Sequence, residues 1–325
     1  MGIRYLNKYF VENCKECIQL MHMNELYGKT IVVDISIYLY KYQMSDSLIE
    51  NMYLMLSLFE CHDITPIFIF DGKPPAEKMD VLNKRYHEKV KAESEYNELY
   101  KKLDNRKLSA RERESVLETM QNLKRKCVFL KKDHIHQVQD LINSYGYTYY
   151  TANGEADEMC AAFVRAKKAW ACLSEDMDMF VYGVPRVLRY MSLLNNTVVM
   201  YDTHKILKRI GISRQDFMEL CIMTGSDYTT DTVMDVYALF KLFHVYAGTP
   251  LSKNMSFRHW LQVHGEAYSV ESMNDETFSS IRNLFIRTTE ETSVLVASAT
   301  SFRREPDRQK IQRILEADGF VYPVT

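Results

Sequence analysis

The sequence has 325 residues, of which 46% are hydrophobic and 26% are charged, and its formal net charge is −2. This composition is typical of a globular protein with a sizeable core, and it excludes fibrous and disordered chains. No stretch reaches the ~18 uninterrupted apolar residues that a membrane helix needs, and charges interrupt the first twenty residues, where a signal peptide would be apolar. We therefore expect an intracellular protein that does not bind membranes.

The seven cysteines are an odd number scattered along the chain, which is typical of free thiols in a reducing compartment. Cys14 and Cys17 have a spacing found in zinc sites, but no second pair of Cys or His stands at a matching distance. We therefore expect free thiols here rather than a disulfide framework or structural zinc.

Continuous, β-branched apolar runs indicate three buried parallel strands, at residues 30–34, 66–71 and 169–173. Each run ends on an aspartate or leads directly into an acidic segment. Helical patterns such as those over 48–61 and 156–168 separate the strands. Strands that alternate with helices predict an α/β domain with a mostly parallel sheet, whose ligands bind at the carboxyl ends of the strands.

The segment 78–132 is almost free of Gly and Pro, and we expect it to be helical. It contains 16 Lys and Arg against nine Asp and Glu, so its net charge is +7 while the rest of the chain carries −9. One interpretation is a solvated helical hairpin with interleaved charge. The other is a basic clamp over phosphates, which the position of the segment between two acid-bearing elements favours.

Seven acids follow strands or lie in short polar turns after apolar segments: Asp34, Asp71, Glu155, Asp157, Asp176, Asp178 and Asp227. Taken singly, each could cap a helix or stabilise a turn. Together at one sheet edge they would repel one another unless cations neutralised them. Oxygen ligands without His or Cys suit Mg²⁺ or Mn²⁺, and two such ions about 4 Å apart can clamp a phosphodiester. The acids therefore predict a metal-dependent nuclease.

These residues also carry a family resemblance, because six motifs occur in family order between residue 1 and about 230. They are Met1-Gly2-Ile3, Val32-Val33-Asp34 with Ser36 and Tyr40, Phe70-Asp71-Gly72-Lys73-Pro74-Pro75, Glu155-Ala156-Asp157 with Cys160-Ala161-Ala162, Glu175-Asp176-Met177-Asp178, and Gly225-Ser226-Asp227-Tyr228. The chain thereby resembles the flap endonuclease/XPG family of structure-specific 5′ nucleases. The resemblance implies a PIN-like α/β domain with a central sheet flanked by helices, a helical arch over about 78–132, and a helical C-terminal region.

The resemblance also implies two metal-binding groups for two Mg²⁺ ions, which Mn²⁺ can replace. One group would comprise Asp34, Asp71, Glu155 and Asp157, and the other Asp176, Asp178 and Asp227. Asp157 stands where the family usually has Glu. Its side chain is shorter by one methylene, so we expect a water between it and the metal.

Further residues correspond to the family's substrate contacts. Lys78 and Arg85 match the catalytic Lys and Arg at the base of the arch, where they would stabilise charge on the scissile phosphate. Tyr40 matches an aromatic platform for a nucleotide beside the cut, although it could also be a core tyrosine with a satisfied hydroxyl. Further nucleic-acid contacts are expected from Lys73, Lys124, Arg125 and Lys126, the last three of which could instead lie on a solvated face.

Two features depart from the family. Residues 229–237 contain no glycine, whereas the family has there a glycine-rich hairpin that binds potassium and holds duplex DNA. Glycines would permit a close approach of backbone to phosphate, so duplex anchoring by this segment is open. Near the C-terminus, Gln312 and Leu315 are followed by Asp318 and Gly319 rather than the two phenylalanines of a sliding-clamp motif, and we expect no clamp binding through it.

The sequence therefore predicts a catalytic domain over 1–230 and a helical region over 231–325 packed on it. We expect a Mg²⁺-dependent 5′ nuclease, a hydrolase that cuts DNA at flaps, nicks or 5′ ends in replication, repair or recombination. One alternative is a 5′-to-3′ exoribonuclease, and another is a catalytically inactive protein that binds DNA junctions. We expect a monomer in the nucleus or at a cytoplasmic replication site, a viral factory if the source is a large DNA virus.

Overall fold

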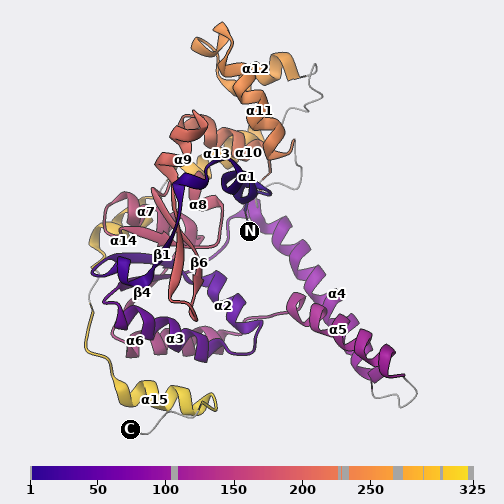
Figure 1. Ribbon diagram of the computed structural model, residues 1–325, viewed down its shortest axis with the longest axis vertical. Coiled ribbons are helices and arrows are strands. Elements are labelled where there is room, and N and C mark those ends of the chain that lie inside the picture. Colours follow the sequence, from indigo (N-terminus) through magenta and orange to yellow (C-terminus); the bar gives the residue numbers. More distant parts are fainter. Residues whose placement is uncertain are drawn as a thin grey trace.

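The computed structural model describes residues 2–103, 109–225, 228, 234–265, 274–287, 289–300 and 303–320. Its centre is a seven-stranded sheet with helices on both faces (Figure 1). The strand order is β1-β7-β6-β5-β2-β3-β4. The strands are β1 (Ile18–His22), β2 (Thr30–Asp34), β3 (Thr65–Phe70), β4 (Thr148–Thr151), β5 (Ala171–Leu173), β6 (Arg186–Ser192) and β7 (Thr197–Asp202). The predicted α/β class is confirmed.

The parallel part of the sheet is formed by β2, β3, β4, β5 and β6. Strand β2 is central, with Val32 opposite Ile67 of β3 and Cys172 of β5. Ile31, Val32 and Val33 are fully buried. Helices cover both faces here, which is why the run is apolar without alternation. Parallel strands end at the same edge, so the residues that follow them are delivered to one side of the molecule.

The antiparallel extension of the sheet was not predicted from the sequence. Strand β7 pairs with β6 and with the edge strand β1, both antiparallel. These strands mix buried and exposed residues, and in β1 only Met21 is buried. Such a pattern carries little of the apolar signal that identified β2 and β3.

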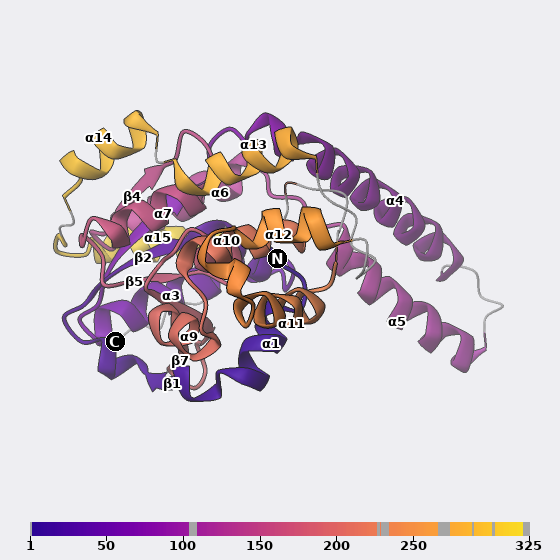
Figure 2. The same ribbon diagram turned by 90° about the horizontal axis from the view of Figure 1, so that it is seen from above.

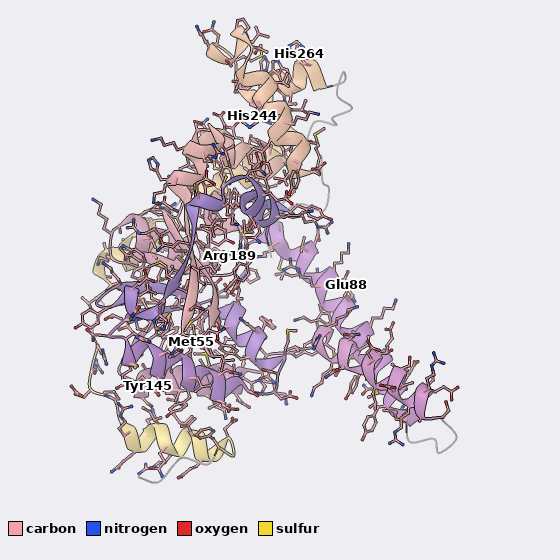
Figure 3. The ribbon with its side chains drawn as sticks, in the orientation of Figure 1. Met55, Glu88, Tyr145, Arg189, His244 and His264 are labelled. Atoms are coloured by element: carbon pink, nitrogen blue, oxygen red, sulfur yellow. The ribbon has the colours of Figure 1, made fainter. Side chains whose placement is uncertain are left out.

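Two apolar layers enclose the sheet. One layer contains α2 (Ile35–Gln43), α3 (Leu48–Cys61), α6 (Lys132–Ser144) and α15 (Arg308–Ala317), with Met55 and Tyr145 among its buried side chains (Figure 3). The other contains α1 (Leu6–Asn13), α7 (Ala156–Arg165), α8 (Asp178–Val181), α9 (Thr203–Ile210), α10 (Arg214–Met223), α11 (Val236–Ala247), α12 (Phe257–His264), α13 (Asp275–Ile286) and α14 (Glu290–Ser298). Cys14 and Cys17 are free thiols buried in this second layer. Burial raises the pKa of Cys14 to about 12, which keeps the thiol protonated.

The basic segment forms an antiparallel helical pair, α4 (Met79–Leu103) and α5 (Ala110–Lys126), that projects from the body (Figures 1 and 2). We call this pair the arch. Ser109 begins α5 with a capping box, since its hydroxyl accepts from the Glu112 amide and Glu112 accepts from the Ser109 amide. The side chains of the pair are mostly exposed, including Glu88 (Figure 3). Among helices of the described ranges, none has the length and apolarity that a bilayer crossing requires.

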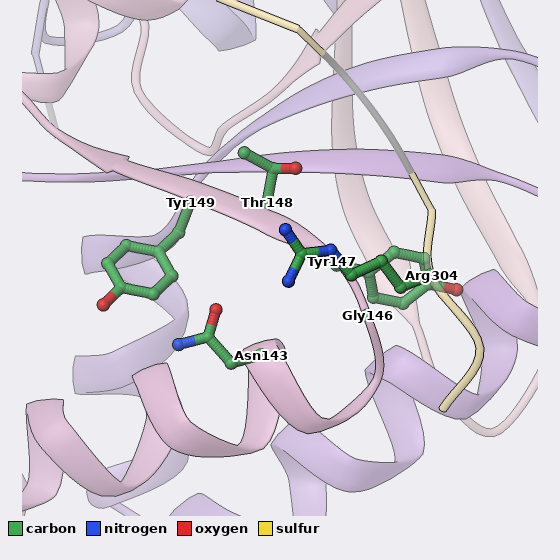
Figure 4. Close-up of a pocket in the computed structure, with 6 residues that line it drawn as sticks. All are labelled: Asn143, Gly146, Tyr147, Thr148, Tyr149 and Arg304. Carbon is green, nitrogen blue, oxygen red and sulfur yellow. The ribbon is translucent and has the colours of Figure 1, made fainter. Parts of the chain in front are cut away.

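The C-terminal helices are distributed over the body rather than gathered in one place. Helix α13 packs on α10, α14 on α7, and α15 on α6. Before α15, Arg304 reaches over the start of β4 beside a cavity of about 520 Å³ lined also by Asn143 and Tyr149 (Figure 4). Leu315, which corresponds to the leucine of the sliding-clamp motif, is fully buried, as is Ile311. These two side chains are therefore part of the hydrophobic core. The domain boundary at residue 230 stays a prediction.

The burial of Leu315 leads to a test of α15. Leu315→Ala should lower the free energy of unfolding by about 2–4 kcal/mol, because it removes a fully buried side chain and leaves a cavity. Urea unfolding followed by circular dichroism measures this loss. Arg313→Ala, an exposed site on the same helix, is the matched control and should change stability by less than about 0.5 kcal/mol. Equal stability of the two variants would contradict the packing described for α15.

Candidate metal centre

The predicted acids meet at the carboxyl edge of the parallel strands. Asp34 ends β2 and caps α2, and Asp71 directly follows β3. Asp176 and Asp178 follow β5, while Glu155 and Asp157 begin α7. The edge therefore receives acids from several elements, as the sequence predicted. Asp227 lies outside the described residues.

Four of these carboxylates are buried. The exposed fractions are 4% for Asp34, 9% for Asp157, 4% for Asp176 and 2% for Asp178. Burying a charged carboxylate costs free energy unless polar partners or a cation compensate it. So many buried acids in one place indicate a site kept for function rather than for stability.

Ser174 supplies polar partners from the end of β5. Its hydroxyl donates to Asp34 Oδ2 at 2.8 Å and accepts from the Asp176 amide at 3.1 Å. The Asp178 amide donates to Asp176 Oδ1 at 3.0 Å. These bonds fix two carboxylates relative to the sheet. Ser174 is fully buried and was not among the predicted site residues, although its position after a buried strand was a signal.

The carboxylates shift the pKa values of one another. Burial raises the pKa of Asp34 to about 8, with further contributions from Asp71 and Asp176. Burial also raises the pKa of Asp157 well above its usual value, and Asp176, Asp34, Glu155 and Asp178 add to the rise. Each carboxylate therefore lies in the negative field of its neighbours, which a proton or a bound cation would relieve.

The segment around Gly2 closes one side of the acid group. Gly2 has a φ of +72°, and a Cβ added there would lie 2.4 Å from Asp176 Oδ1 and 2.5 Å from Asp178 Oδ1. Both the backbone conformation and the close approach require glycine. The sequence identified Met1-Gly2-Ile3 only as a motif, and this contact gives the glycine a physical reason.

The chemistry of the donor set fits a hard divalent cation. All the predicted ligands are carboxylates, which Mg²⁺ and Mn²⁺ prefer. Within the described part of the chain, no three acidic, His or Cys side chains converge tightly enough to enclose an ion alone. Mg²⁺ commonly binds through one or two carboxylates and keeps several waters. The donor chemistry of these acids therefore suits Mg²⁺ or Mn²⁺.

Lys78 lies at the edge of this group, in the short helical turn Ala76–Lys78 that precedes α4. Its ammonium forms an ion pair with Glu155 Oε1, and both side chains are largely buried. The same ammonium lies 5.5 Å from the centre of the Tyr228 ring. The predicted catalytic lysine is thus held beside a predicted metal ligand. Arg85, half-buried on α4, lies two turns further along the arch.

Tyr228 is a site residue that the prediction used only as part of a motif. Its hydroxyl donates to Glu155 Oε2 and lies 3.3 Å from the Tyr182 hydroxyl. Burial raises the pKa of Tyr228, and Tyr182 and Glu155 add to the rise, so the phenol stays protonated and acts as a donor. Glu155 is therefore held from two sides, by Lys78 and by Tyr228.

Backbone contacts place Asp71. The Ala156 amide donates to Asp71 Oδ1 at 2.9 Å, and the Gly72 amide donates to the Gly154 carbonyl at 2.8 Å. A Cβ on Gly72 would lie 1.8 Å from the Ala152 carbonyl oxygen, so a larger residue would push the two loops apart. Lys73 is exposed beside this contact, in a position open to a nucleic-acid backbone.

The remaining predicted contacts lie around the arch. Tyr40 of α2 is 41% exposed, and its pKa is raised by burial and by the Asp71 carboxylate, which places it near the acids. Lys124, on the last turn of α5, forms an ion pair with Asp46 in the turn between α2 and α3. Arg125 and Lys126 are exposed.

The glycine-free segment is described only in part. Residues 229–233 lie outside the described residues. Helix α11 begins at Val236 and is capped by the Asp235 side chain, which accepts from the Tyr237 amide at 2.8 Å. An aspartate cap therefore starts this helix at the end of the segment that lacks glycine.

The raised pKa of Asp34 leads to a test of the electrostatics. The carboxyl ionises near pH 3.8 when unfolded and near pH 8 when folded, so rising pH between these values destabilises the fold. Asp34→Asn removes this penalty and should raise the free energy of unfolding at pH 7.5 in EDTA by about 1–3 kcal/mol. Excess Mg²⁺ should stabilise the wild type and stabilise the variant less.

Thermal and urea unfolding check this prediction. Glu98→Gln, which removes an exposed acid from the arch, is the control. It should change neither the free energy of unfolding in EDTA nor the stabilisation by Mg²⁺ appreciably. Wild type and Asp34→Asn with equal stability at pH 7.5, and equal responses to Mg²⁺, would show that the repulsion is absent.

Comparison with known proteins places the chain in a family. The family model described as the XPG N-terminal domain matches residues 1–92, and the XPG I-region model matches residues 146–227. Flap endonuclease 1 of Xenopus tropicalis is 27% identical over 247 residues, covering 70% of this chain and 61% of that protein. The human flap endonuclease 1 is 26% identical over 247 residues, covering 70% of this chain and 62% of that protein. The matched region thus spans less than two thirds of these relatives.

Solved structures share the fold across nearly the whole chain. The catalytic core of Rad2 in complex with DNA substrate matches with a TM-score of 0.64 and 21% identity, over 98% of this chain and 95% of that one. Human GEN1 in complex with Holliday junction DNA matches with a TM-score of 0.66 and 20% identity, over 98% of this chain and 74% of that one. Flap endonuclease-1 from Methanococcus jannaschii matches with a TM-score of 0.61 and 20% identity, over 93% of this chain and 90% of that one. With its two XPG regions and this nuclease-core fold, the chain belongs to the flap endonuclease/XPG family.

Proposed function

We propose that this protein is a Mg²⁺-dependent, structure-specific 5′ nuclease that hydrolyses DNA phosphodiester bonds at flaps, nicks or 5′ ends. The observation that carries the proposal is the group of buried carboxylates at the sheet edge, where neighbouring acids add to the burial that raises the pKa of Asp34 and of Asp157. The names of the relatives, which are flap endonucleases, support it. So does the basic arch that begins beside the acids.

The carboxylates would hold the metal in two groups, as in the sequence-based assignment. One group would comprise Asp34, Asp71, Glu155 and Asp157, and the other Asp176, Asp178 and Asp227. Ser174 links the two groups, since its hydroxyl donates to Asp34 and accepts from the Asp176 amide. When bound, Mg²⁺ supplies Lewis-acid stabilisation of a phosphoryl oxygen and lowers the pKa of a water. Two ions, and the replacement of Mg²⁺ by Mn²⁺, belong to the same proposal.

The cationic side chains would act on the substrate. The Lys78 ammonium forms an ion pair with Glu155, so a phosphate that enters beside it would compete with that carboxylate for the ammonium. A positive charge placed there stabilises negative charge that builds up on the phosphate during cleavage. Arg85 lies further along the same helical element and could contact the next phosphate through its planar guanidinium.

The rest of the arch would hold the DNA backbone. With a net charge of +7 against −9 elsewhere, the segment 78–132, which contains the arch, is the part of the chain that attracts phosphate. Lys73, Arg125 and Lys126 are exposed and would make such contacts, and Lys124, also exposed, would have to exchange its ion pair with Asp46 for phosphate. The same proposal has the protein act as a monomer inside the cell, without a sliding-clamp motif.

A panel of labelled substrates tests the proposal. We expect cleavage of DNA flaps and nicked DNA with Mg²⁺ and none with EDTA, and Asp178→Asn should lower the rate by roughly a thousandfold or more while DNA binding persists. Binding should be intact because the variant removes a negative charge that faces phosphate. Glu98→Gln is the control and should cleave normally.

The outcomes of the panel separate the alternatives. Faster cleavage of single-stranded RNA than of DNA flaps would favour the exoribonuclease, for which the lack of glycine in 229–237 is the supporting observation. DNA binding without cleavage under any divalent cation would favour the inactive junction-binding protein. Near-normal turnover of Asp178→Asn would contradict the metal-dependent reading of the acids.

The hydrogen bond from Tyr228 to Glu155 leads to a further test. Tyr228→Phe keeps the ring under Lys78 but removes the donor, and should lower the single-turnover rate by about tenfold with little change in affinity. Lys78→Ala should cost about a hundredfold or more. The two effects should be less than additive in the double variant, because both side chains act on Glu155.

Single-turnover cleavage of one flap substrate measures this coupling. Lys84→Ala, on an exposed site of α4, is the control for loss of a basic arch residue and should affect affinity more than rate. Fully additive effects would show that Tyr228 and Lys78 do not share Glu155 as their target.

A further inference from the structure

The root of the arch carries a cation–aromatic cluster. Lys89 of α4 places its ammonium 4.6 Å from the centre of the Tyr40 ring and 5.6 Å from that of Phe129. Tyr86, one turn earlier on α4, meets Phe129 edge-on, with ring centres 6.4 Å apart. We call Tyr40, Tyr86, Lys89 and Phe129 the arch-root cluster. It joins α2, α4 and the segment between α5 and α6.

Lys89 contacts aromatic rings rather than a carboxylate. Its side chain is half-buried, and no carboxylate of a described residue lies within ion-pair distance of its ammonium. Burial, and the charge of Arg85, lower its pKa. The ring faces compensate the lost hydration, since a cation over an aromatic face is attracted by the ring quadrupole. Neighbouring Lys91, by contrast, is exposed and pairs with Glu95 one turn on.

Lys89 covers one face of the Tyr40 ring, the ring that the family resemblance makes a stacking platform for a nucleobase. Tyr40 is 41% exposed and lies close enough to the acids for Asp71 to shift its pKa. An ammonium and a base cannot occupy the same ring face at once. A base that stacks there must therefore displace Lys89, and the displaced ammonium would lie among the phosphates of the same strand.

We propose that Lys89 is a positioning residue that ties the arch to Tyr40 in the free protein and exchanges this ring for a substrate phosphate when a nucleobase stacks on Tyr40. The proposal rests on the proposed function for its second half. Without substrate, the contact of Lys89 with Tyr40 would hold the root of the arch in place. When a base stacks on Tyr40, the Lys89 ammonium would be released next to the bound strand.

Hydrogen exchange of the free, full-length chain tests the tie. Lys89→Met keeps the length and apolar stem of the side chain but removes the charge, and Lys91→Met is the matched control on the same helix. Amides of residues 79–92 should exchange roughly three- to tenfold faster in Lys89→Met and unchanged in Lys91→Met. Lys89→Arg should restore most of the protection, because guanidinium also stacks on aromatic rings. Unchanged exchange in Lys89→Met would overturn the tie, whatever the protein cleaves.

Single-turnover cleavage tests the exchange of partners. A DNA flap carrying either a normal or an abasic nucleotide beside the cut is compared in wild type, Lys89→Met, Tyr40→Leu and the double variant. Lys89→Met should slow the normal substrate by roughly three- to tenfold, and much less in the Tyr40→Leu background or on the abasic substrate. Equal losses in every background and on both substrates would make Lys89 an independent phosphate contact and overturn the exchange.

The two experiments keep this inference separate from the proposed function. Absence of cleavage by the wild type on any substrate would refute the nuclease and, with it, the exchange step. The hydrogen-exchange result would then still decide whether Lys89 ties the arch to Tyr40.

Discussion

Repulsion among carboxylates at one sheet edge is the constraint on which the rest of the site depends. Asp34, Asp157 and Asp176 are buried. Burial raises the pKa of Asp34 and of Asp157, and neighbouring acids, Asp176 among them, add to both rises, a cost to stability that apolar residues would avoid. Ser174 and backbone amides offset part of it through hydrogen bonds, but they leave the negative field in place. A bound cation would offset the rest. The parallel sheet matters because its strands end together, which is what brings the acids to one edge.

The arch is joined to this edge through one continuous helical element. Lys78 ends the short turn that leads into α4, and Arg85 and Lys89 follow at seven and four residues. Spacings of four and seven place side chains on one face of a helix. Glu155 holds the first of these cations and the Tyr40 ring holds the last. The orientation of the arch is therefore set at its root by the same residues that surround the acids.

The sequence predicted the parallel centre well because its signal is local and strong. The bounds of β2 and α3 agree with the predicted ranges 30–34 and 48–61, whereas β5 starts only at Ala171. Strands β1, β4, β6 and β7 were missed because their runs mix polar and apolar residues. The predicted acids meet, but the partners that hold them, such as Ser174 and Tyr228, could not be assigned. Those contacts join residues far apart in the chain, and no periodicity encodes them.

Three cations near the proposed substrate path already have internal partners. Lys78 pairs with Glu155, Lys89 lies on Tyr40 and Phe129, and Lys124 pairs with Asp46. A phosphate that binds any of these side chains would therefore replace its internal partner. The net gain in binding free energy is smaller than for a cation that was surrounded only by water. A single phosphate gains little from one exchange. A strand that follows the arch from Lys124 to Lys78 would make all three exchanges at once, so these internal pairs would favour a DNA whose path fits the arch over one that merely carries charge.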